Sequence, residues 1–292
     1  MEGTLEYRPG LLARFFRGAR WYGAEWYITV AGAFILIAVV IVTLLAPHIA
    51  PYDPIKFVGK PFTRPNSQFL MGTDNLGRDV FSRVVYGARV VLIIALLSSV
   101  FSALVGVPLG LLSGFIGGAV DRVLSLIMDS IYSFPSLILA IAIAAMLGPG
   151  IINIAISIAV VYIPTYFRMV RGQTLSVKEE LYVEAARSLG ARAATILRLY
   201  VFPNVIPSVV VVFSLNIADA ILTEAGLSFL GLGLPPPTPD WGFDLSAGRA
   251  YLPGGYWWII TFPGMMIALV ALGFSMLGEG LNEILNPRLT EA

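Results

Sequence analysis

The sequence contains no cysteine and a single histidine, His48. Without cysteine, neither a disulfide framework nor a thiolate metal site is available. One imidazole without partners cannot make a metal site or a histidine-based catalytic triad, so we expect an interfacial polar role for His48. The net charge is only +1, and this chain therefore lacks the basic surplus that binding to nucleic acid requires.

Signs of a nucleotide site or an active site are also missing. The three lysines, Lys56, Lys60 and Lys178, do not stand in the Gly-Lys-Ser/Thr context of a phosphate-binding loop. The chain also lacks the Ser/His, His/His or paired-aspartate constellation of an intramembrane enzyme. We therefore predict a protein that is not an enzyme, with no metal site and no ATP site of its own.

Charged residues are scarce as well, at 13%, whereas 57% of the residues are hydrophobic and the mean hydropathy is +0.82. A chain of this composition is typical of a membrane protein. A helix of about 20 apolar residues is long enough to cross the bilayer. The sequence predicts six spans, with prolines that membrane helices tolerate as kinks. The spans are 28–46, 90–112, 123–147, 151–167, 205–222 and 257–277, and the prolines are Pro135, Pro164, Pro207 and Pro263.

The predicted organisation places both termini in the cytoplasm, because most lysines and arginines then fall on that side. Six basic residues in the first external loop make this bias moderate. The segments are a cytoplasmic tail 1–27, the first span 28–46, an extracellular loop 47–89, a five-helix core 90–278 and a cytoplasmic tail 279–292. The core includes a cytoplasmic loop 168–204 and an external loop 225–256.

Ionisable side chains within the spans are few, and they are costly at membrane depth unless they face a cavity or a partner. Asp129, Asp219 and Glu224 are the examples. A place on a translocation path and a structural hydrogen bond between helices both fit these residues. Further candidates for polar lining of the path are Asn153, Ser214 and Asn216.

The segment between the fourth and fifth spans is unusually polar. Ser176-Val177-Lys178-Glu179 has the form of a capping box, which predicts that a helix begins near Val177. Leu181, Ala185 and Leu189 recur every four residues, and Glu184 and Arg187 lie on the opposite face of the expected helix. The pattern indicates two amphipathic helices around Gly190.

Two interpretations of this segment are open. The first is a helix on the inner leaflet, with Arg187, Arg192 and Arg198 against lipid phosphate. The second is a surface that docks a partner, since the small residues Ala186 and Gly190 permit close approach. The segment lacks the interfacial aromatic residues and lysines of a lipid anchor until its very end, which favours docking.

These residues carry a resemblance to a known family. Glu184-Ala185-Ala186, followed six positions after the glutamate by Gly190 and thirteen later by Pro203, resembles the EAA loop of ABC importer permeases. Three further stretches resemble the C-type permease subunit of the dipeptide/oligopeptide/nickel importers. They are Phe69 to Arg89, Glu224 to Gly242 and the C-terminal LGEGLNEILNPRL, in which Glu279, Asn282 and Asn286 replace the usual Asp, Arg and Asp.

The resemblance implies an all-α membrane protein with six transmembrane helices, the type I ABC permease fold and cytoplasmic coupling helices. It implies a homologous second permease, two ATPase subunits that bind ATP and Mg, and an extracytoplasmic solute-binding protein, in the inner membrane of a prokaryote. Gly190 would allow the sharp turn, Pro203 would end the docking helix, and Glu184 would brace the turn or contact the ATPase. The implied coupling residues are Glu184, Ala185, Ala186, Arg187, Gly190, Arg192 and Pro203.

The external signatures have a structural reading of their own. Gly72 to Asp79 is typical of an Asx turn followed by a helix start, with Asp79 able to pair with Arg78 or Arg83. A proline-rich stretch before Trp241 predicts a stiff loop. We assign both to docking of the binding protein or gating of the outer mouth, with packing against the second permease as the alternative. The candidate residues are Asp74, Arg78, Asp79, Pro237 and Trp241.

The function that follows is an ATP-driven importer subunit that passes a short oligomeric solute inward by alternating access. The solute would be a di- or oligopeptide, or an oligosaccharide such as a β-glucan. A secondary transporter or channel that uses Asp129 and Asp219 is the alternative from another class. A nickel importer is a further alternative, which the lack of cysteine and the single histidine disfavour.

Overall fold

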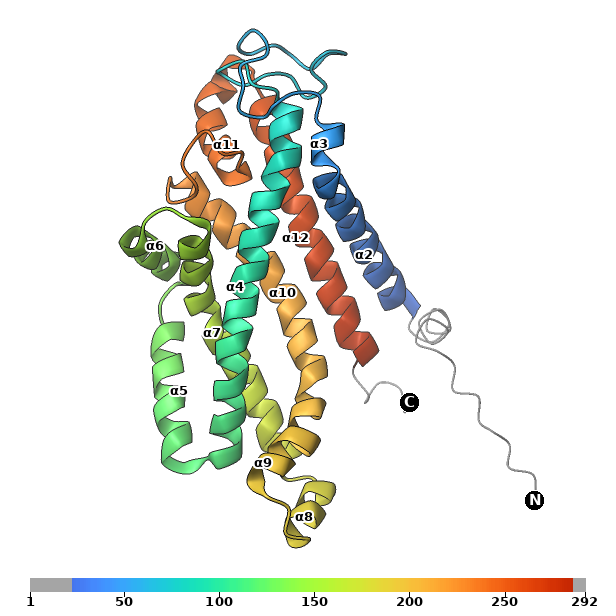
Figure 1. Ribbon diagram of the computed structural model, residues 1–292, viewed down its shortest axis with the longest axis vertical. Coiled ribbons are helices and arrows are strands. Elements are labelled where there is room, and N and C mark those ends of the chain that lie inside the picture. The colour runs from blue at the N-terminus through green and yellow to red at the C-terminus, as the bar shows by residue number, and fades with distance from the viewer. Residues whose placement is uncertain (1–22, 286–292) are drawn as a thin grey trace, which may run out of the picture.

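The computed structural model describes residues 23–285, in which the regular elements are helices (Figure 1). Residues 1–22 and 286–292 of the two predicted tails, Asn286 among them, lie outside the described residues, whereas 23–27 and 279–285 belong to helices. The long helices are α2 (Gly23–Leu44), α4 (Val80–Ile116), α7 (Ile151–Val177), α10 (Phe202–Phe229) and α12 (Trp258–Leu285). The shorter ones are α3 (Ala46–Ile49), α5 (Gly118–Tyr132), α6 (Ser136–Leu147), α8 (Leu181–Ser188), α9 (Ala193–Ile196), a π-helix η1 (Leu197–Val201), α11 (Trp241–Gly248) and a 3-10 helix η2 (Arg249–Gly254).

Five continuous helical segments are long and apolar enough to cross a membrane. The predicted third span, 123–147, is instead the pair α5 and α6, which meet at 90° across a short break and count as a sixth span if taken together. The break ends at Pro135, whose ring disfavours helical geometry in the preceding residue. Helices α7, α10 and α12 continue through Pro164, Pro207 and Pro263.

Several helices are longer than the predicted spans. Helix α4 begins ten residues before the predicted second span and is 37 residues long. The predicted fifth span, 205–222, is the middle of a continuous 37-residue segment, 193–229, made of α9, η1 and α10. At about 1.5 Å per residue, each of these rods is about 55 Å long, which exceeds the roughly 30 Å of bilayer hydrocarbon.

Helices α4 and α7 pack with their backbones in close contact. Ser102 of α4 donates a hydrogen bond to the carbonyl oxygen of Ala159 in α7, at 3.0 Å. Below it follow Gly106, Gly110 and Gly114 at intervals of four residues. A Cβ atom at any of these glycines would lie within 2.9 Å of a backbone oxygen of α7. This stripe of small residues is the kind of surface that lets membrane helices approach closely.

Replacing Gly110 with leucine is expected to destabilise the chain, because its Cβ would lie 2.7 Å from the carbonyl oxygen of Phe167. Overpacking of this kind costs about 1–3 kcal/mol or more. Thermal unfolding of the purified protein in detergent measures the loss. The matched control is Gly172→Leu, since nothing lies within 4 Å of the Cβ position there. Equal melting temperatures for the two variants would contradict the packing assignment.

A second group of helices is formed by α10, α12 and α2, in which α12 packs against both of the others (Figure 1). Ser214 of α10 donates to the carbonyl oxygen of Phe274 in α12, at 3.1 Å. Gly32 of α2 faces the backbone of α12, where a Cβ atom would lie 2.8 Å from the carbonyl oxygen of Gly273. Buried apolar side chains from α2, α4, α6, α7, α10 and α12 join the two groups into one core.

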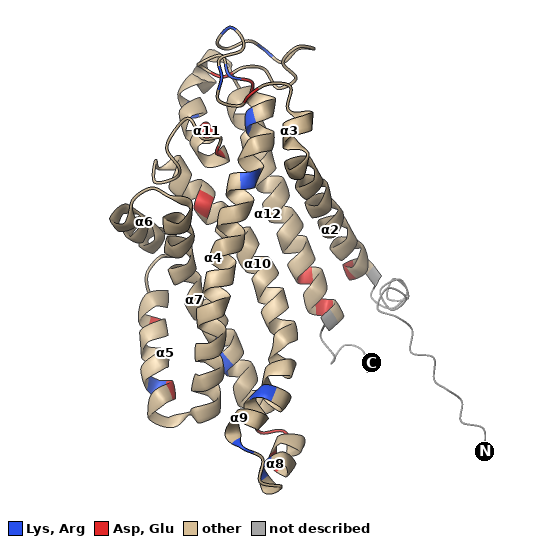
Figure 2. Cartoon of the chain, viewed as in Figure 1, with Lys and Arg blue, Asp and Glu red and all other residues tan. Residues whose placement is uncertain are grey.

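Charge gathers mainly at the two ends of the elongated molecule (Figure 2). One end, here called the loop end, consists of residues 50–79, α11 and η2. The other, here called the α8 end, consists of α8, α9 and η1. Between them α4, α10 and α12 are largely free of charged residues, as expected for membrane-spanning helices.

Candidate functional site

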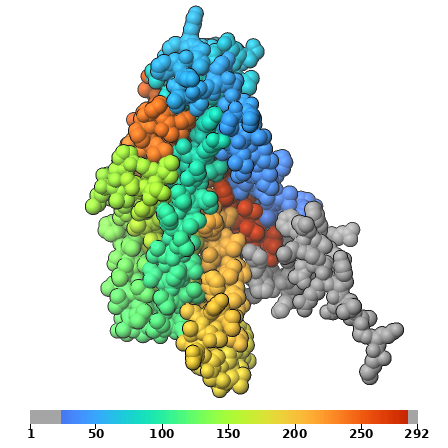
Figure 3. Space-filling view, viewed as in Figure 1, coloured from blue at the N-terminus to red at the C-terminus, as the bar shows by residue number. Residues whose placement is uncertain are grey.

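Helix α8 forms a knob that projects beyond the ends of α4 and α5 (Figure 3). Two of its side chains, Val183 and Ala186, are buried, and Val183 packs into a cluster of buried residues from α4, α7, α9, η1 and α10. The predicted coupling residue Ala186 is therefore an internal contact of the chain. Because α8 is held through one face only, its other face is left exposed.

The exposed face of α8 is partly apolar. Leu181 is 80% exposed and Leu189, directly after the helix, is 89% exposed. Glu184 and Ala185 are exposed between them. Exposed leucines on a projecting knob at the polar end of the molecule are a feature that a partner surface would bury.

The turn after α8 has the geometry that the sequence predicts for Gly190. Its φ of +81° is left-handed, which glycine adopts at little cost. The amide of Gly190 donates to the carbonyl oxygen of Arg187, and that of Ala191 donates to the carbonyl oxygen of Ala186, both at 3.0 Å. These two bonds form a Schellman motif that ends α8. Arg192 follows as the N-cap residue of α9.

The start of α8 differs from the prediction. Ser176-Val177-Lys178-Glu179 is the end of α7 rather than a capping box, and α8 begins only at Leu181. The amide of Lys178 still donates to the carbonyl oxygen of Thr174, at 3.0 Å. Thr174 and Val177 are buried, so packing extends α7 past the local capping signal.

The prediction that Pro203 ends the docking helix is also wrong. Pro203 stands in the first turn of α10, and the helix continues from residue 193 to residue 229. The π-helix η1 directly precedes the proline, and the amide of Phe202 donates to the carbonyl oxygen of Leu197 five residues earlier. The wider π turn lets the helix accommodate a residue that has no amide hydrogen.

Three polar contacts tie α7 to its neighbours near the α8 end. Lys178 donates to the carbonyl oxygen of Gly114 in α4, at 3.0 Å. Arg171 binds both carboxylate oxygens of Asp121 in α5. Arg168 pairs with Asp129, also in α5, at 2.7 Å. The polar residues of α5 therefore fasten it to α7.

At the loop end, Asp74 organises the turn before α4. Its Oδ1 accepts from the amides of Leu76 and Arg78, at 2.8 and 2.9 Å, which confirms the predicted Asx turn. Asp79 is the N-cap residue of α4 and accepts from the amide of Ser82, as the predicted helix start requires. The predicted pairing of Asp79 with an arginine is wrong, because Arg78 binds Asp74 at 2.6 Å.

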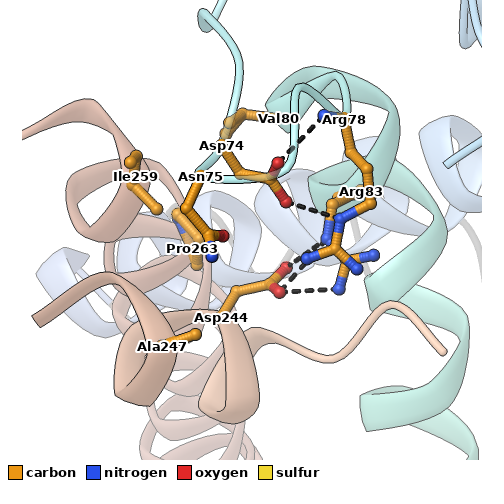
Figure 4. Close-up of a pocket in the computed structure, with 9 residues that line it drawn as sticks. All are labelled: Asp74, Asn75, Arg78, Val80, Arg83, Asp244, Ala247, Ile259 and Pro263. Atoms are coloured by element: carbon orange, nitrogen blue, oxygen red, sulfur yellow. Dashed lines mark hydrogen bonds and ion pairs between the residues drawn. The ribbon is translucent and has the colours of Figure 1, made fainter. Parts of the chain in front are cut away.

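Arg83 likewise binds a residue other than the predicted Asp79. It binds Asp244 of α11 through two nitrogens, with the shortest N–O distance 2.6 Å, and both residues are buried (Figure 4). Its third nitrogen donates to the carbonyl oxygens of Pro54 and Pro237, each at 3.2 Å. Burial raises the pKa of the Asp244 carboxyl, and Arg83 opposes that rise. One guanidinium thus joins the first loop, α4, the proline-rich stretch and α11.

Two tryptophans complete this arrangement. Trp241 is fully buried and donates from Nε1 to the carbonyl oxygen of Val84, at 2.8 Å, and Trp258 does the same to Thr73, at 3.0 Å. Of the residues assigned to docking or gating, four are buried within the chain, namely Asp74, Arg78, Asp79 and Trp241. Pro237 is the exposed one among the five. The loop-end signatures therefore hold this chain together.

The candidate residues for a translocation path do not converge on one cavity. Asn216 is buried and accepts from Tyr166 of α7, at 3.4 Å, and Ser214 bonds to α12. Asn153 donates to the carbonyl oxygen of Leu147, at 2.9 Å, and so caps the end of α6. Asp129 is exposed in its ion pair, and Asp219 is exposed on α10. Four of the five thus bond to the backbone or to a neighbouring helix, and Asp219 is the exception.

Sequence reasoning missed two of the fastenings. Arg83 and Asp244 are 161 positions apart in the sequence, and Asp121 and Arg171 are 50 apart. No short sequence pattern therefore predicts either ion pair. The glycine stripe of α4 was visible as three glycines four residues apart. In residues 23–285, no three His, Asp or Glu side chains gather as a metal site would require.

The comparisons with known proteins agree with this architecture. The family model described as "Binding-protein-dependent transport system inner membrane component" matches residues 106–291. The chain belongs to this family. It is a permease subunit of an ABC importer and a multi-pass protein of the inner membrane.

Its curated relatives are similar over nearly their whole length. The di/tripeptide transport system permease protein DppC of Pseudomonas aeruginosa is 40% identical over 89% of this chain and 88% of that protein. The probable D,D-dipeptide transport system permease protein DdpC of Escherichia coli is 37% identical over 98% and 97%. The glutathione transport system permease protein GsiD of Pectobacterium atrosepticum is 37% identical over 90% and 88%. These relatives confirm the resemblance to the C-type permeases.

A solved structure shares the fold. A chain of the MetNI methionine ABC transporter, crystallised in an inward-facing conformation, aligns with a TM-score of 0.56 over 70% of this chain and 96% of that chain. The sequence identity is 18%, so the likeness concerns the fold alone. It confirms the predicted ABC importer permease fold.

Proposed function

We propose that this chain passes short peptides across the membrane as one half of the pore of an ATP-driven importer. The names of the relatives, which refer to di/tripeptides, a D,D-dipeptide and glutathione, support peptides over oligosaccharides or nickel. The observation that carries the coupling role is the projecting α8, with its exposed Leu181 and Leu189 and its glycine turn.

In this proposal the α8 end faces the cytoplasm, and both termini are cytoplasmic. The exposed face of α8 docks into one of two ATPase subunits, which bind ATP and Mg. A homologous second permease completes the pore, and an extracytoplasmic binding protein delivers the peptide at the loop end. ATP binding shifts the pair of permeases between two states by alternating access, since each ligand favours the state that it binds more tightly.

The test is co-purification combined with one backbone substitution. We expect the tagged chain, purified from native membranes in mild detergent, to bring an ATPase and a second permease with it. Gly190→Val is expected to abolish ATP-dependent peptide uptake, because a β-branched residue is strained at a φ of +81°. The control is Gly172→Val, where no neighbouring atom lies within 4 Å. Purification without an ATPase, together with normal uptake by Gly190→Val, would refute the proposal.

Peptide specificity has a separate test. The cognate binding protein is purified without added ligand, and its bound solute is identified by mass spectrometry. A short peptide is the expected result. An oligosaccharide in the binding site would overturn the peptide assignment and leave the coupling role of α8 untouched.

A further inference from the structure

Helix α10 carries a fully buried glutamate near the loop end. Glu224 is 0% exposed, and neither of its carboxyl oxygens has a hydrogen-bond partner among the described residues. An ionised carboxylate without a donor or a counter-charge is costly in such surroundings. Ser228 stands four residues later, one turn further along the same face of the helix.

A second buried carboxyl group lies against this face. Asp240, the N-cap residue of α11, is 0% exposed. Its Oδ2 accepts from the hydroxyl of Ser228, at 2.6 Å, and its Oδ1 accepts from the amide of Phe243, at 3.0 Å. Gly242 packs against Ala225 and Ser228 without room for a Cβ atom, so the start of α11 lies on the face of α10 that carries Glu224 and places Asp240 beside it. Because Asp240 has two donors and a helix N-terminus, it is well placed to carry the negative charge of the pair.

The nearby arginine side chains are already bound to other groups. From α4, Arg83 is bound to Asp244 of α11 and to two carbonyl oxygens. Arg78 is bound to Asp74. Beyond the end of α10, the guanidinium of Arg249 lies over the ring of Phe229, 4.9 Å from its centroid.

The other neighbours of this part of α10 do not supply a charge partner either. From α7, the hydroxyl of Tyr162 bonds to that of Thr223, at 2.9 Å. From α6, the apolar side chain of Leu137 lies beside Gly226. Asp219, five residues before Glu224 on α10, is an exposed carboxyl group and adds only negative charge.

We propose that Glu224 and Asp240 form a proton-binding site, in which Glu224 keeps its proton and donates it in a hydrogen bond to Asp240. One proton gives Glu224 the bond that it lacks and leaves a single negative charge on Asp240. The carboxyl–carboxylate bond joins α10 to the start of α11. The site is independent of the α8 end and of the identity of the transported solute.

A bound metal cation fits these groups less well. Calcium takes six to eight oxygen ligands, and magnesium needs an octahedral set. Here each carboxylate oxygen of Asp240 already accepts one hydrogen bond, from Ser228 or from Phe243, and has one further acceptor position. In residues 23–285 no third acidic or histidine side chain joins Glu224 and Asp240 as a metal site would require, whereas a proton needs only the two carboxyl groups.

The site fastens the loop that follows α10. A cavity of about 340 Å³ adjoins Ser228 and is lined by the glycines and prolines of residues 231–236, by the end of α6 and by Phe243 of α11. With the proton in place, α11 is bound to α10 beside this cavity. Loss of the proton puts two like charges side by side in a buried position, which drives α11 away from α10.

Infrared difference spectroscopy of the purified complex tests the site. We expect the wild-type protein at neutral pH to show the band of a protonated carboxyl group, and Glu224→Gln to lose it. The matched control is Asp219→Asn, which removes an exposed carboxyl group from the same helix and is expected to keep the band. Absence of the band from the wild-type protein, or its persistence in Glu224→Gln, would overturn the proposal.

Thermal unfolding gives a second readout that does not depend on spectral assignment. The folded chain holds the proton and the unfolded chain releases it, so the melting temperature of the wild-type protein is expected to fall as the pH rises from neutral. Glu224→Gln, which keeps a donor but cannot ionise, is expected to lose this part of the pH dependence. If the melting temperature instead rises with added sodium or calcium chloride in the wild-type protein alone, the site binds a cation and the proton proposal is wrong.

Discussion

Aspartates in place of Leu181 and Leu189 are expected to detach the ATPase from the permease and to abolish transport, while the chain itself remains folded. The two leucines are 80% and 89% exposed, so the substitution removes few contacts within the chain. Buried in a partner groove, the same side chains would contribute about 1.5–3 kcal/mol each, and a desolvated carboxylate would oppose docking further. The measurement is the amount of ATPase that co-purifies with the double variant.

The control places the same change at the other end of the molecule. Leu252 of η2 is 46% exposed, and Leu252→Asp is expected to leave the attachment of the ATPase unchanged. The melting temperature of each variant shows whether it has folded. A folded double variant that still retains its ATPase would show that the exposed face of α8 is not the docking surface.

Removing the guanidinium of Arg83 is expected to produce the largest loss of stability among single substitutions at the loop end. Arg83→Ala leaves Asp244 buried without its counter-charge, and breaking a buried pair from one side costs about 3–5 kcal/mol. The carbonyl oxygens of Pro54 and Pro237 also lose their donor. Thermal or denaturant unfolding in detergent measures the effect.

Two comparisons isolate the cause. The double variant Arg83→Met with Asp244→Leu removes both charges and is expected to recover much of the lost stability, because apolar side chains of similar volume replace a buried pair at little cost. Lys56→Ala breaks an exposed ion pair with Asp53 in the same loop and is expected to change little. If Arg83→Ala and Lys56→Ala have similar effects, the pair does not fasten the loop end.

Local signals in the sequence predicted local structure well. The Asx turn at Asp74, the helix start at Asp79 and the glycine turn at Gly190 each depend on a few neighbouring residues, and each is present. The family resemblance, which depends on spacing along the chain, predicted the fold. These features have in common that a short stretch of sequence contains all the groups that make them.

Predictions failed where distant packing overrides a local preference. The capping box predicted at Ser176 is absent, because burial of the end of α7 extends that helix past it. The helix end predicted at Pro203 is also absent, because the helix continues through a π turn into α10. The expected pairing of Asp79 with Arg78 or Arg83 is absent, because the fold brings Asp244 to Arg83 from 161 residues away. One sequence contains no signal for such pairs, because they depend on which helices pack together.

The glycine stripe on α4 also bears on how the molecule moves. Helices held backbone to backbone along several turns have no compressible side-chain layer between them, so α4 and α7 should shift as one stiff plate. The 37-residue rod that ends in α10 packs on α12 and also on α4 and α7, so it lies between this pair and the pair formed by α12 and α2. The connection from α7 to this rod runs through α8. In the proposed coupling, a displacement of α8 would therefore act on α7 and on this rod at the same time.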